Sequence, residues 1–445
     1  MSELPRGWAE ATLPELVGPD GVFSDGDWVE TKDQDPDGGV RLTQLADVGE
    51  GSWRNRSQRY MTQQAAERLG CTFLQSADVL IARMPDPLGR ACIFPGDPRP
   101  CVTAVDVCVV RPGSSSVDAR WLMWWLNTPQ IRAEVLSRQA GTTRKRISRK
   151  NLAAIALPIP PLAEQRRIVA AIEEQLSRLD ASLAALSAVG HRADALRGAI
   201  LRQVTRAEGE SVVTGDVAEV QGGIQKQPKR RPTNNRFPFL RVANVKRGEL
   251  DLSEVHEVEL FGNELERFAL RRGDLLVVEG NGSSDQIGRS AMWTGEIQDC
   301  VHQNHLIRIR PGPGLDPAFL DLYWNAPSTA QRIRDVASST SGLYTLSTAK
   351  VKAVPLCLPP LNEQRRVAAE AIRQLSQVER LQHRVRTAVR RASVLRKAIL
   401  TSAFRGELVA QAPNDEPASI LLERIAAERA AAPAMPSRRR VPAGR

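Results

Sequence analysis

One set of residues has the types and spacing of a catalytic metal site. Asp20, Glu30 and Lys32 match the order of a metal-dependent nuclease motif, in which two carboxylates bind a divalent cation beside a lysine. However, residues 18–21 read Gly-Pro-Asp-Gly, which is typical of a turn, whereas such carboxylates need adjacent strand ends to converge. A self-sufficient nuclease is therefore an alternative that requires Asp20, Glu30 and Lys32 to meet in space.

A second set offers zinc-ligand side chains. Cys300, His302 and His305 follow one another closely, but no fourth ligand stands at a recognisable spacing, so a structural or phosphate-contacting role is favoured. The sequence also lacks an Asn-Pro-Pro-aromatic tetrapeptide, a glycine-rich cofactor loop and a phosphate-binding loop. We therefore expect no catalytic residue, no metal site and no cofactor of its own in this chain.

Polar loops in both halves of the chain carry side chains that read bases or hold phosphates in nucleic-acid complexes. In the first half these residues are Arg54, Asn55, Arg56, Arg59, Thr142, Thr143, Arg144, Lys145 and Arg146. In the second half they are Lys226, Lys229, Arg230, Arg231, Asn281, Ser283, Gln303, Asn304 and Tyr344. Loops are polar in most proteins, so any one of these residues is equally compatible with a surface role without DNA contact.

The elements that position these loops are duplicated. The segment LPIPPLAEQRR at residues 157–167 returns 199 positions later as LCLPPLNEQRR at residues 356–366. The same offset carries LRGAIL at 196–201 onto LRKAIL at 395–400, so the intervening segment has kept its length. The chain is therefore a tandem repeat with a rigid spacer in each copy.

Each spacer is predicted to be a long helix, because no proline follows the Pro-Pro pair until after residues 206 and 411. The apolar positions match in pairs at steps of mostly three and four, which predicts a coiled-coil seam. The pairs are Leu176 with Leu375, Leu179 with Val378, Leu186 with Val385, Val189 with Ala388, Ala193 with Ala392, Leu196 with Leu395, and Ile200 with Ile399. We expect the two helices to pair antiparallel; two ordinary helices in separate bundles are the alternative.

The segments before the helices combine short strands with helical runs, which predicts an α+β fold with twisted, largely antiparallel sheets. Similar tetrads, Leu-Gly-Arg-Ala at 88–91 and Ile-Gly-Arg-Ser at 287–290, follow a predicted strand in each copy. The expected organisation is a domain at 1–158, a helix at 159–208, a second domain at 209–357, a second helix at 358–408, and a tail with a short helix at 409–445. Antiparallel helices predict a pseudo-two-fold repeat with the domains at opposite ends.

Charge is unevenly distributed along the chain. The formal net charge is +10, yet residues 1–150 hold 19 basic and 19 acidic side chains and residues 209–355 hold 18 of each. Residues 356–445 hold 17 basic and 8 acidic side chains, which suggests a polyanion or an acidic protein surface alongside the second helix. No apolar run of 18 residues and no leader sequence is present, and six cysteines lack a Cys-x-x-Cys pair, so we expect a soluble, cytoplasmic protein with reduced thiols and no membrane partner.

Two variable domains, each ending in Pro-Pro-Leu-x-Glu-Gln-Arg-Arg and a long helix, resemble the specificity subunit of type I restriction-modification systems. The resemblance covers nearly the whole chain. It implies two target-recognition domains, each reading one half of a bipartite, asymmetric site in double-stranded DNA. It also implies two methyltransferase subunits that bind S-adenosylmethionine and flip out an adenine, and restriction subunits that use ATP and Mg²⁺.

The resemblance also implies a role for the start of each helix, where framework or partner contacts are expected rather than catalytic groups. These residues are Leu162, Glu164, Gln165 and Arg166 with Leu361, Glu363, Gln364 and Arg365. A DNA-recognition adaptor of another phage-defence system, without a methyltransferase partner, would share the same sequence pattern and is the main alternative.

Overall fold

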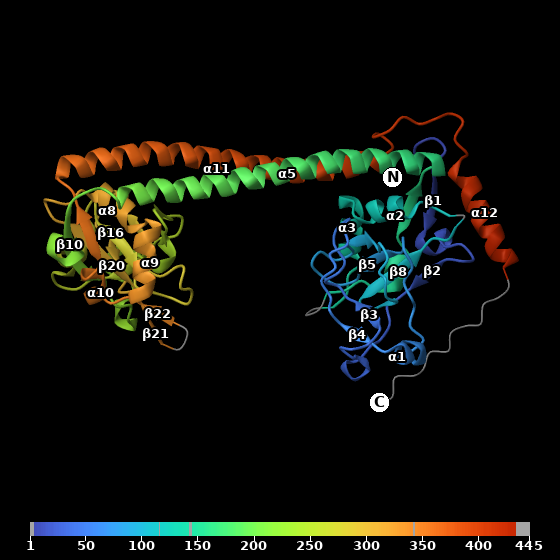
Figure 1. The fold of residues 1–445 in the computed structure, drawn as a ribbon, viewed down its shortest axis with the longest axis horizontal. Coiled ribbons are helices and arrows are strands. Elements are labelled where there is room, and N and C mark those ends of the chain that lie inside the picture. Colours follow the sequence, from blue (N-terminus) through green and yellow to red (C-terminus); the bar gives the residue numbers. More distant parts are fainter. Residues whose placement is uncertain (1–3, 115, 142–144, 341–342, 433–445) are drawn as a thin grey trace. The chain divides into compact units, whose positions relative to one another are not determined.

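The computed structural model describes residues 4–114, 116–141, 145–340 and 343–432, without the side chains of residues 281, 338–340 and 343. The chain forms two compact units (Figure 1). The first unit consists of the described residues within Met1–Ala184 and Val389–Arg445. The second unit consists of those within Ala185–Ala388. Each unit therefore contains one α+β domain and parts of both long helices.

The first unit contains a four-stranded antiparallel sheet in the order β2-β8-β5-β6, a three-stranded sheet β4-β3-β7 and the pair β1-β9. Its strands are β1 (Ala9–Thr12), β2 (Val22–Ser24), β3 (Val40–Thr43), β4 (Tyr60–Met61), β5 (Val79–Ala82), β6 (Ala91–Ile93), β7 (Cys101–Thr103), β8 (Val107–Arg111) and β9 (Ala156–Ile159). Its short helices are η1 (Leu13–Leu16), η2 (Thr31–Asp33), α1 (Gln63–Arg68), α2 (Ala119–Leu126), α3 (Pro129–Ser137) and α4 (Arg149–Ala153).

The second unit repeats these three sheets as β11-β20-β16-β18, β15-β12-β19 and β10-β23, and adds β13-β14 and β17-β22-β21. Its strands are β10 (Glu210–Val213), β11 (Ala218–Gly222), β12 (Arg236–Leu240), β13 (Val245–Lys246), β14 (Glu249–Leu250), β15 (His256–Glu259), β16 (Leu275–Val278), β17 (Gly280–Asn281), β18 (Ser290–Met292), β19 (Val301–His302), β20 (Leu306–Pro311), β21 (Ser338–Thr340), β22 (Leu343–Thr345) and β23 (Pro355–Leu358). Its short helices are α6 (Thr214–Val217), η3 (Pro228–Arg230), η4 (Val242–Asn244), α7 (Glu264–Phe268), α8 (Pro317–Trp324), α9 (Pro327–Val336) and α10 (Thr348–Lys352).

Matching side chains hold the repeated scaffold together. Asp118 and Asp316 cap the N-termini of α2 and α8, each accepting from two backbone amides. Gly89 and Gly288 have φ of 77° and 67°, and a Cβ at either would lie within 3 Å of a side chain of α3 or α9. The duplicated α+β scaffold predicted from the sequence is thereby confirmed.

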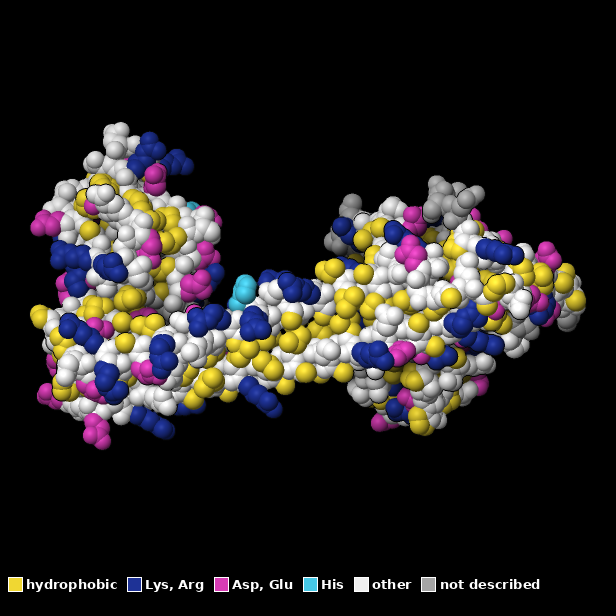
Figure 2. All heavy atoms as spheres, turned by 90° about the horizontal axis from the view of Figure 1, so that it is seen from above, with side chains coloured by type: hydrophobic (Ala, Val, Ile, Leu, Met, Phe, Trp, Pro, Cys, Tyr) yellow, Lys and Arg dark blue, Asp and Glu magenta, His cyan; other side chains and the backbone are white. Residues whose placement is uncertain are grey.

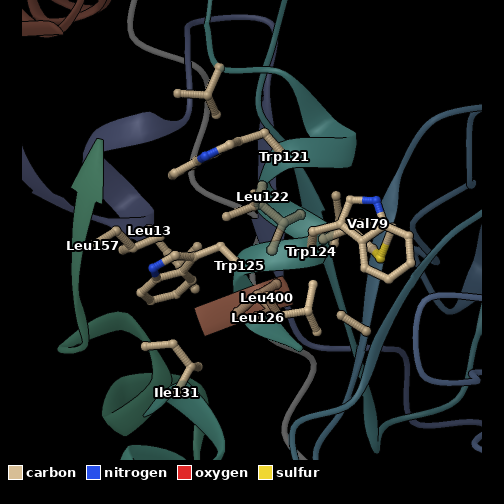
Figure 3. Packing of buried hydrophobic residues seen from close by; sticks show 14 of the residues in the cluster. Leu13, Val79, Trp121, Leu122, Trp124, Trp125, Leu126, Ile131, Leu157 and Leu400 are labelled. Atoms are coloured by element: carbon tan, nitrogen blue, oxygen red, sulfur yellow. The ribbon is translucent and has the colours of Figure 1, made fainter. Parts of the chain in front are cut away.

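The core of the first unit collects around the tryptophan-rich helix α2. Figure 3 shows Trp121, Trp124 and Trp125 among aliphatic side chains of the same cluster. The cluster also contains Leu157 from β9 and Leu400 from the second long helix, α11 (Leu361–Ala403). The long helix therefore contributes side chains to the core of the domain. Packing there removes the apolar side of the helix from water, which is favourable.

The other long helix is α5 (Leu162–Val204), and the two helices pair antiparallel within each unit. In the second unit Asp194 accepts from Gln382 at 2.6 Å and Arg197 pairs with Glu379 at 3.4 Å, so residue numbers rise along α5 as they fall along α11. In the first unit Arg396 pairs with Asp180. The predicted seam is buried at four of its seven pairs: Leu176 with Leu375, Leu179 with Val378, Ala193 with Ala392, and Ile200 with Ile399.

One predicted seam pair is wrong. Leu196 and Leu395 are 51% and 50% exposed. On α5 the buried residues nearby are Ala193, Ile200, Leu201 and Val204, and at 3.6 residues per turn Leu196 lies roughly 80° from their mean direction. Helix α5 turns its buried face toward the second domain at this point, and α11 turns its buried face toward the first domain near Leu395, so both leucines are exposed.

The C-terminal segment completes the first unit instead of standing apart as a tail. Helix α12 (Ala418–Ala431) buries Leu421 and Ile425 in the cluster of Trp121. Asp415 accepts both guanidinium N–H groups of Arg167 at 2.5 and 3.4 Å. A short helix in this segment was predicted, but its packing on the first domain was not. Among the described residues, none of the helices combines the length and apolarity needed to span a bilayer.

Candidate nucleic-acid interface

The first candidate loop, residues 44–57, is held by a buried carboxylate. Asp47 accepts from the backbone amides of Gln44, Arg56 and Ser57 at 2.7–2.8 Å, and pairs at 3.3 Å with Arg41, which is also buried. A carboxylate with this many donors fixes the loop backbone from inside. Sequence reasoning did not identify Asp47 or Arg41 as residues that shape the site.

The predicted contact residues of this loop lie on its surface. Arg54, Asn55 and Arg56 are all exposed, and Asn55 has φ of 51°, in the left-handed region. Arg59 is exposed as well and donates to the side chain of Gln34 at 3.1 Å. The loop therefore presents two arginines and one asparagine on a rigid backbone, which suits contact with phosphates and base edges.

The second unit builds the corresponding loop with an amide in place of the carboxylate. Asn244 is buried, accepts from the Arg241 amide at 2.8 Å, and donates to the carbonyl oxygens of Asp251 and Glu254 at 2.8 Å. The sequences Leu-Ala-Asp-Val at 45–48 and Val-Ala-Asn-Val at 242–245 are the signal that could have revealed this correspondence. The same position thus organises a loop in both domains while the loop side chains differ.

Arg90 and Arg289, the arginines of the two matching tetrads, each donate hydrogen bonds to backbone carbonyl oxygens of these loops. Arg90 donates from Nε to Val48 O at 2.7 Å and from Nη2 to Leu45 O at 2.8 Å. Arg289 donates from Nε to Val245 O at 2.7 Å and from Nη2 to Val242 O at 3.1 Å. Burial lowers the pKa of both guanidinium groups. Their donors are already occupied by carbonyl oxygens, so both arginines support the interface from within.

The second candidate loop of the first unit is only partly described. Ala140 and Arg146 exchange two backbone hydrogen bonds at 2.8 and 2.9 Å, which closes the loop, and Lys145 and Arg146 are exposed. Arg146 lies 3.9 Å from Asp106. The other predicted contacts in this loop, Thr142, Thr143 and Arg144, lie outside the described residues.

Four basic residues of the second unit were predicted to lie in a contact loop. Lys226, Lys229 and Arg231 are exposed, whereas Arg230 is half-buried. Its guanidinium donates two hydrogen bonds to the carboxylate of Glu264, at 2.6 and 2.7 Å. The pair lowers the pKa of Glu264 to about 2. The guanidinium of Arg230 therefore holds the loop against α7, and its contact with DNA stays a prediction.

The remaining predicted contacts of the second unit lie in or next to short strands. The extra sheet β17-β22-β21 places Asn281 opposite Tyr344, which is half-buried; the side chain of Asn281 lies outside the described part. Ser283 is exposed beyond β17. Gln303 and Asn304 are half-buried, and their backbone amides donate to Leu240 O and Ile224 O at 2.9 Å.

The residues predicted as framework or partner contacts differ in their exposure. Glu164, Gln165 and Gln364 are at most 1% exposed, which fits the framework alternative and not a partner surface. Glu164 accepts from Trp8 Nε1 at 3.2 Å, and the two glutamines bind backbone groups of their own domains. Arg166 and Arg365 are exposed, whereas three others are partly exposed: Leu162, Leu361 and Glu363. Glu363 pairs with Arg366 at 2.7 Å.

The basic side of α11 is solvent-exposed. Figure 2 shows Lys and Arg side chains together with apolar side chains on the surface of the paired helices. Arg384, Arg386 and Arg391 are all exposed. The choice between a polyanion and an acidic protein partner for this surface stays a prediction.

The two possible catalytic sets do not assemble. Asp20 accepts from the Ser114 amide at 3.1 Å, whereas Glu30 pairs with Lys32 at 2.7 Å, and no interaction among the described residues joins Asp20 to Glu30. Burial raises the pKa of the Cys300 thiol to about 12, which opposes the thiolate form that binds zinc. His305 is exposed and bonds Glu279 at 3.2 Å, while His302 is fully buried.

The structure is a duplicated α+β scaffold with paired helices, and comparisons with known proteins agree with this description. A family model described as the type I restriction modification DNA specificity domain matches residues 28–186. The specificity subunit of the type I restriction enzyme EcoKI from Escherichia coli strain K12 is 27% identical over 351 residues, which cover 73% of this chain and 74% of that protein.

Two solved structures share the fold. A chain from a structure on complex assembly and conformational transition of the type I R-M system has a TM-score of 0.74 at 20% identity, covering 92% of this chain and 100% of its own. The HsdS subunit from Thermoanaerobacter tengcongensis has a TM-score of 0.54 at 21% identity, with 91% and 98% covered. The resemblance predicted from the repeated signature is confirmed: the chain is similar over most of its length to specificity subunits of type I restriction-modification systems.

Proposed function

We propose that this chain binds a bipartite, asymmetric site in double-stranded DNA, with each α+β domain reading one half. The observation that carries the proposal is the pair of loops organised by Asp47 and Asn244. Equivalent buried side chains fix the two loop backbones, but the exposed residues that the loops present are different. A common scaffold with different surface side chains suits recognition of two different base sequences.

We also propose that the chain contributes no catalytic group and instead positions other subunits. Two methyltransferase subunits with S-adenosylmethionine, and restriction subunits with ATP and Mg²⁺, would carry the chemistry. The exposed Arg166 and Arg365, at equivalent positions in the first turn of each long helix, are proposed contacts for the two methyltransferase copies. Their equivalence supports two similar docking surfaces, one in each repeat.

Domain exchange tests the proposal. Residues 209–355 are replaced by the corresponding domain of a relative with a different target, and the recognised sequence is read by methylome sequencing of a host that carries the partner subunits. The expected result is a new sequence in one half-site and an unchanged sequence in the other. The matched control replaces the first domain and should change the opposite half.

Two outcomes would contradict the proposal. A change in both half-sites would mean that the domains do not read DNA independently. Sequence-specific DNA binding by a chain that never co-purifies with a methyltransferase would favour the adaptor of another defence system.

A further inference from the structure

The two units carry a pair of topologically equivalent loops, residues 28–39 and residues 225–235. The first loop follows the parallel bridge of Asp27 with Ala104, and the second follows the parallel bridge of Ile224 with Gln303. Each loop contains one 3-10 turn, η2 or η3, and leads into the central strand of its three-stranded sheet, β3 or β12. The two loops therefore occupy the same place in the repeated fold.

The charges of these equivalent loops are opposite. Residues 28–39 contain four acidic side chains and one lysine, whereas residues 225–235 contain four basic side chains and none that is acidic. The two domains as a whole are each neutral, so the difference is local. A loop facing phosphates gains from basic side chains and is repelled by acidic ones.

The basic loop borders a hollow of about 800 Å³ that lies entirely within the second unit. Lys226, Arg231, Arg241 and His256 line it, and apolar side chains including Phe239 contribute to its wall. Phe239 is 2% exposed in the central strand β12, so the sheet behind the hollow is rigid core. The hollow thus combines a firm wall with several cationic side chains.

The basic side chains of the hollow differ in whether a carboxylate lies beside them. Arg241 and His256 both lie next to Glu254, at 3.3 and 2.7 Å. Lys226 and Arg231 are exposed and form no ion pair with any residue that the structure describes. Their unmatched charges make the mouth of the hollow attractive to an anion.

The first unit uses the same place differently. Arg59 in the first unit and His256 in the second occupy equivalent positions, because Arg59 lies opposite Leu42 and His256 lies opposite Phe239 in the central strand. Arg59 donates a hydrogen bond to the side chain of Gln34 in the acidic loop at 3.1 Å. Trp28 in that loop is 68% exposed and Asp37 is exposed as well. The exposed charged side chains of residues 28–39 are Glu30, Lys32 and Asp37, so acidic groups outnumber basic ones where the second unit presents only basic ones.

We infer that the hollow bordered by residues 225–235 binds a backbone phosphate of duplex DNA through Lys226 and Arg231, and that the first unit has no counterpart of this contact. The inference rests on the proposed function, because it requires that the second domain faces DNA. At this place in the fold the second domain therefore gains a phosphate contact that the first domain lacks. This contact makes the binding of DNA depend more steeply on salt.

Salt titrations of the full-length chain, with whatever subunits co-purify, test the inference. The probe is a duplex recovered by selection from a random pool, and the variant is Lys226→Gln with Arg231→Gln. Loss of this one phosphate contact should make the slope of log affinity against log salt shallower by about one. Between roughly 50 and 200 mM salt, the variant should therefore lose about 3.5-fold less affinity than the parent.

Matched variants give the controls. Lys32→Gln changes the only cation of the equivalent loop and should leave the slope unaltered. Lys226→Arg with Arg231→Lys keeps both charges and should restore it. Phosphate ethylation interference should mark a position in one half-site with the parent chain and lose that position with the double Gln variant.

An unaltered slope and an unaltered interference pattern, with sequence-specific binding retained, would overturn the inference while leaving the proposed function intact. Saturable binding of free ATP that the double Gln variant loses, without a change in slope, would assign the hollow to a free nucleotide and would also overturn it. Absence of sequence-specific DNA binding by the parent chain would instead contradict the proposed function.

Discussion

Replacement of Gln165 by alanine should loosen the joint between the first domain and its long helix. The side chain is fully buried in the first turn of α5. Its Oε1 accepts from the Asp118 amide at 2.9 Å, and its Nε2 donates to Pro160 O at 2.9 Å. Asp118 is also the N-cap of α2, so one glutamine connects the start of α5 to the helix that carries the tryptophan core.

The magnitude follows from the groups that the substitution leaves without partners. A buried donor or acceptor left unpaired costs about 1–3 kcal/mol, so the loss of two partners in Gln165→Ala should destabilise the first unit by about 2–6 kcal/mol. Gln364 binds three backbone groups, Asp316 N, Pro359 O and Gly314 O, at 2.8–2.9 Å. Gln364→Ala should therefore cost the second unit at least as much.

Hydrogen exchange read by mass spectrometry is the appropriate assay, because a chain of two units need not unfold in one step. Peptides that cover α2 should exchange faster in Gln165→Ala, and peptides that cover α8 should exchange faster in Gln364→Ala. Arg166→Ala is the matched control: this neighbour is exposed, and its loss should cost less than about 0.5 kcal/mol. If Gln165→Ala left hydrogen exchange unchanged but abolished co-purification of a methyltransferase, the reasoning would be refuted, and Gln165 would be a partner contact.

Three further predictions concern single side chains. Burial raises the pKa of Asp321 from its ordinary 3.8 to about 6, so the folded state favours the protonated carboxyl and the second unit loses stability as pH rises from 4 to 6. Asp321→Asn should remove that loss and gain up to about 3 kcal/mol at pH 7, measured by urea unfolding. An equal effect at pH 3.5 would contradict this explanation. Leu179→Ala should cost about 2–3 kcal/mol in thermal unfolding while Leu196→Ala costs less than about 0.5, and equal effects would mean that both leucines lie in the seam. Asp415→Asn removes the ion pair with Arg167, and a partly exposed pair of this kind contributes only about 0.2–1 kcal/mol. Hydrogen exchange in α12 should therefore become several-fold faster, with little change elsewhere. An unchanged exchange rate would show that apolar burial alone holds α12 on the first domain.

The sequence by itself determined the repeat, the α+β scaffold and the paired helices, because these depend on local signals. Proline-free segments after matching Pro-Pro pairs predicted helices at 159–208 and 358–408, close to the observed Leu162–Val204 and Leu361–Ala403. A seam repeating at three and four residues has to bury its apolar side chains, and the four buried pairs follow from that periodicity. The family resemblance rested on the same repeated signature.

Only the tertiary structure decided which polar residues face solvent. Arg230 was predicted to contact DNA, but its guanidinium is paired with Glu264, which is distant in sequence. Gln165 and Gln364 were predicted as partner contacts, but both side chains are buried. The opposite charges of residues 28–39 and 225–235 gain meaning only when the strand bridges show that the loops are equivalent. Periodicity along the chain reports which side of an element is buried, whereas the partner of a charged or amide side chain is set by segments that folding brings together.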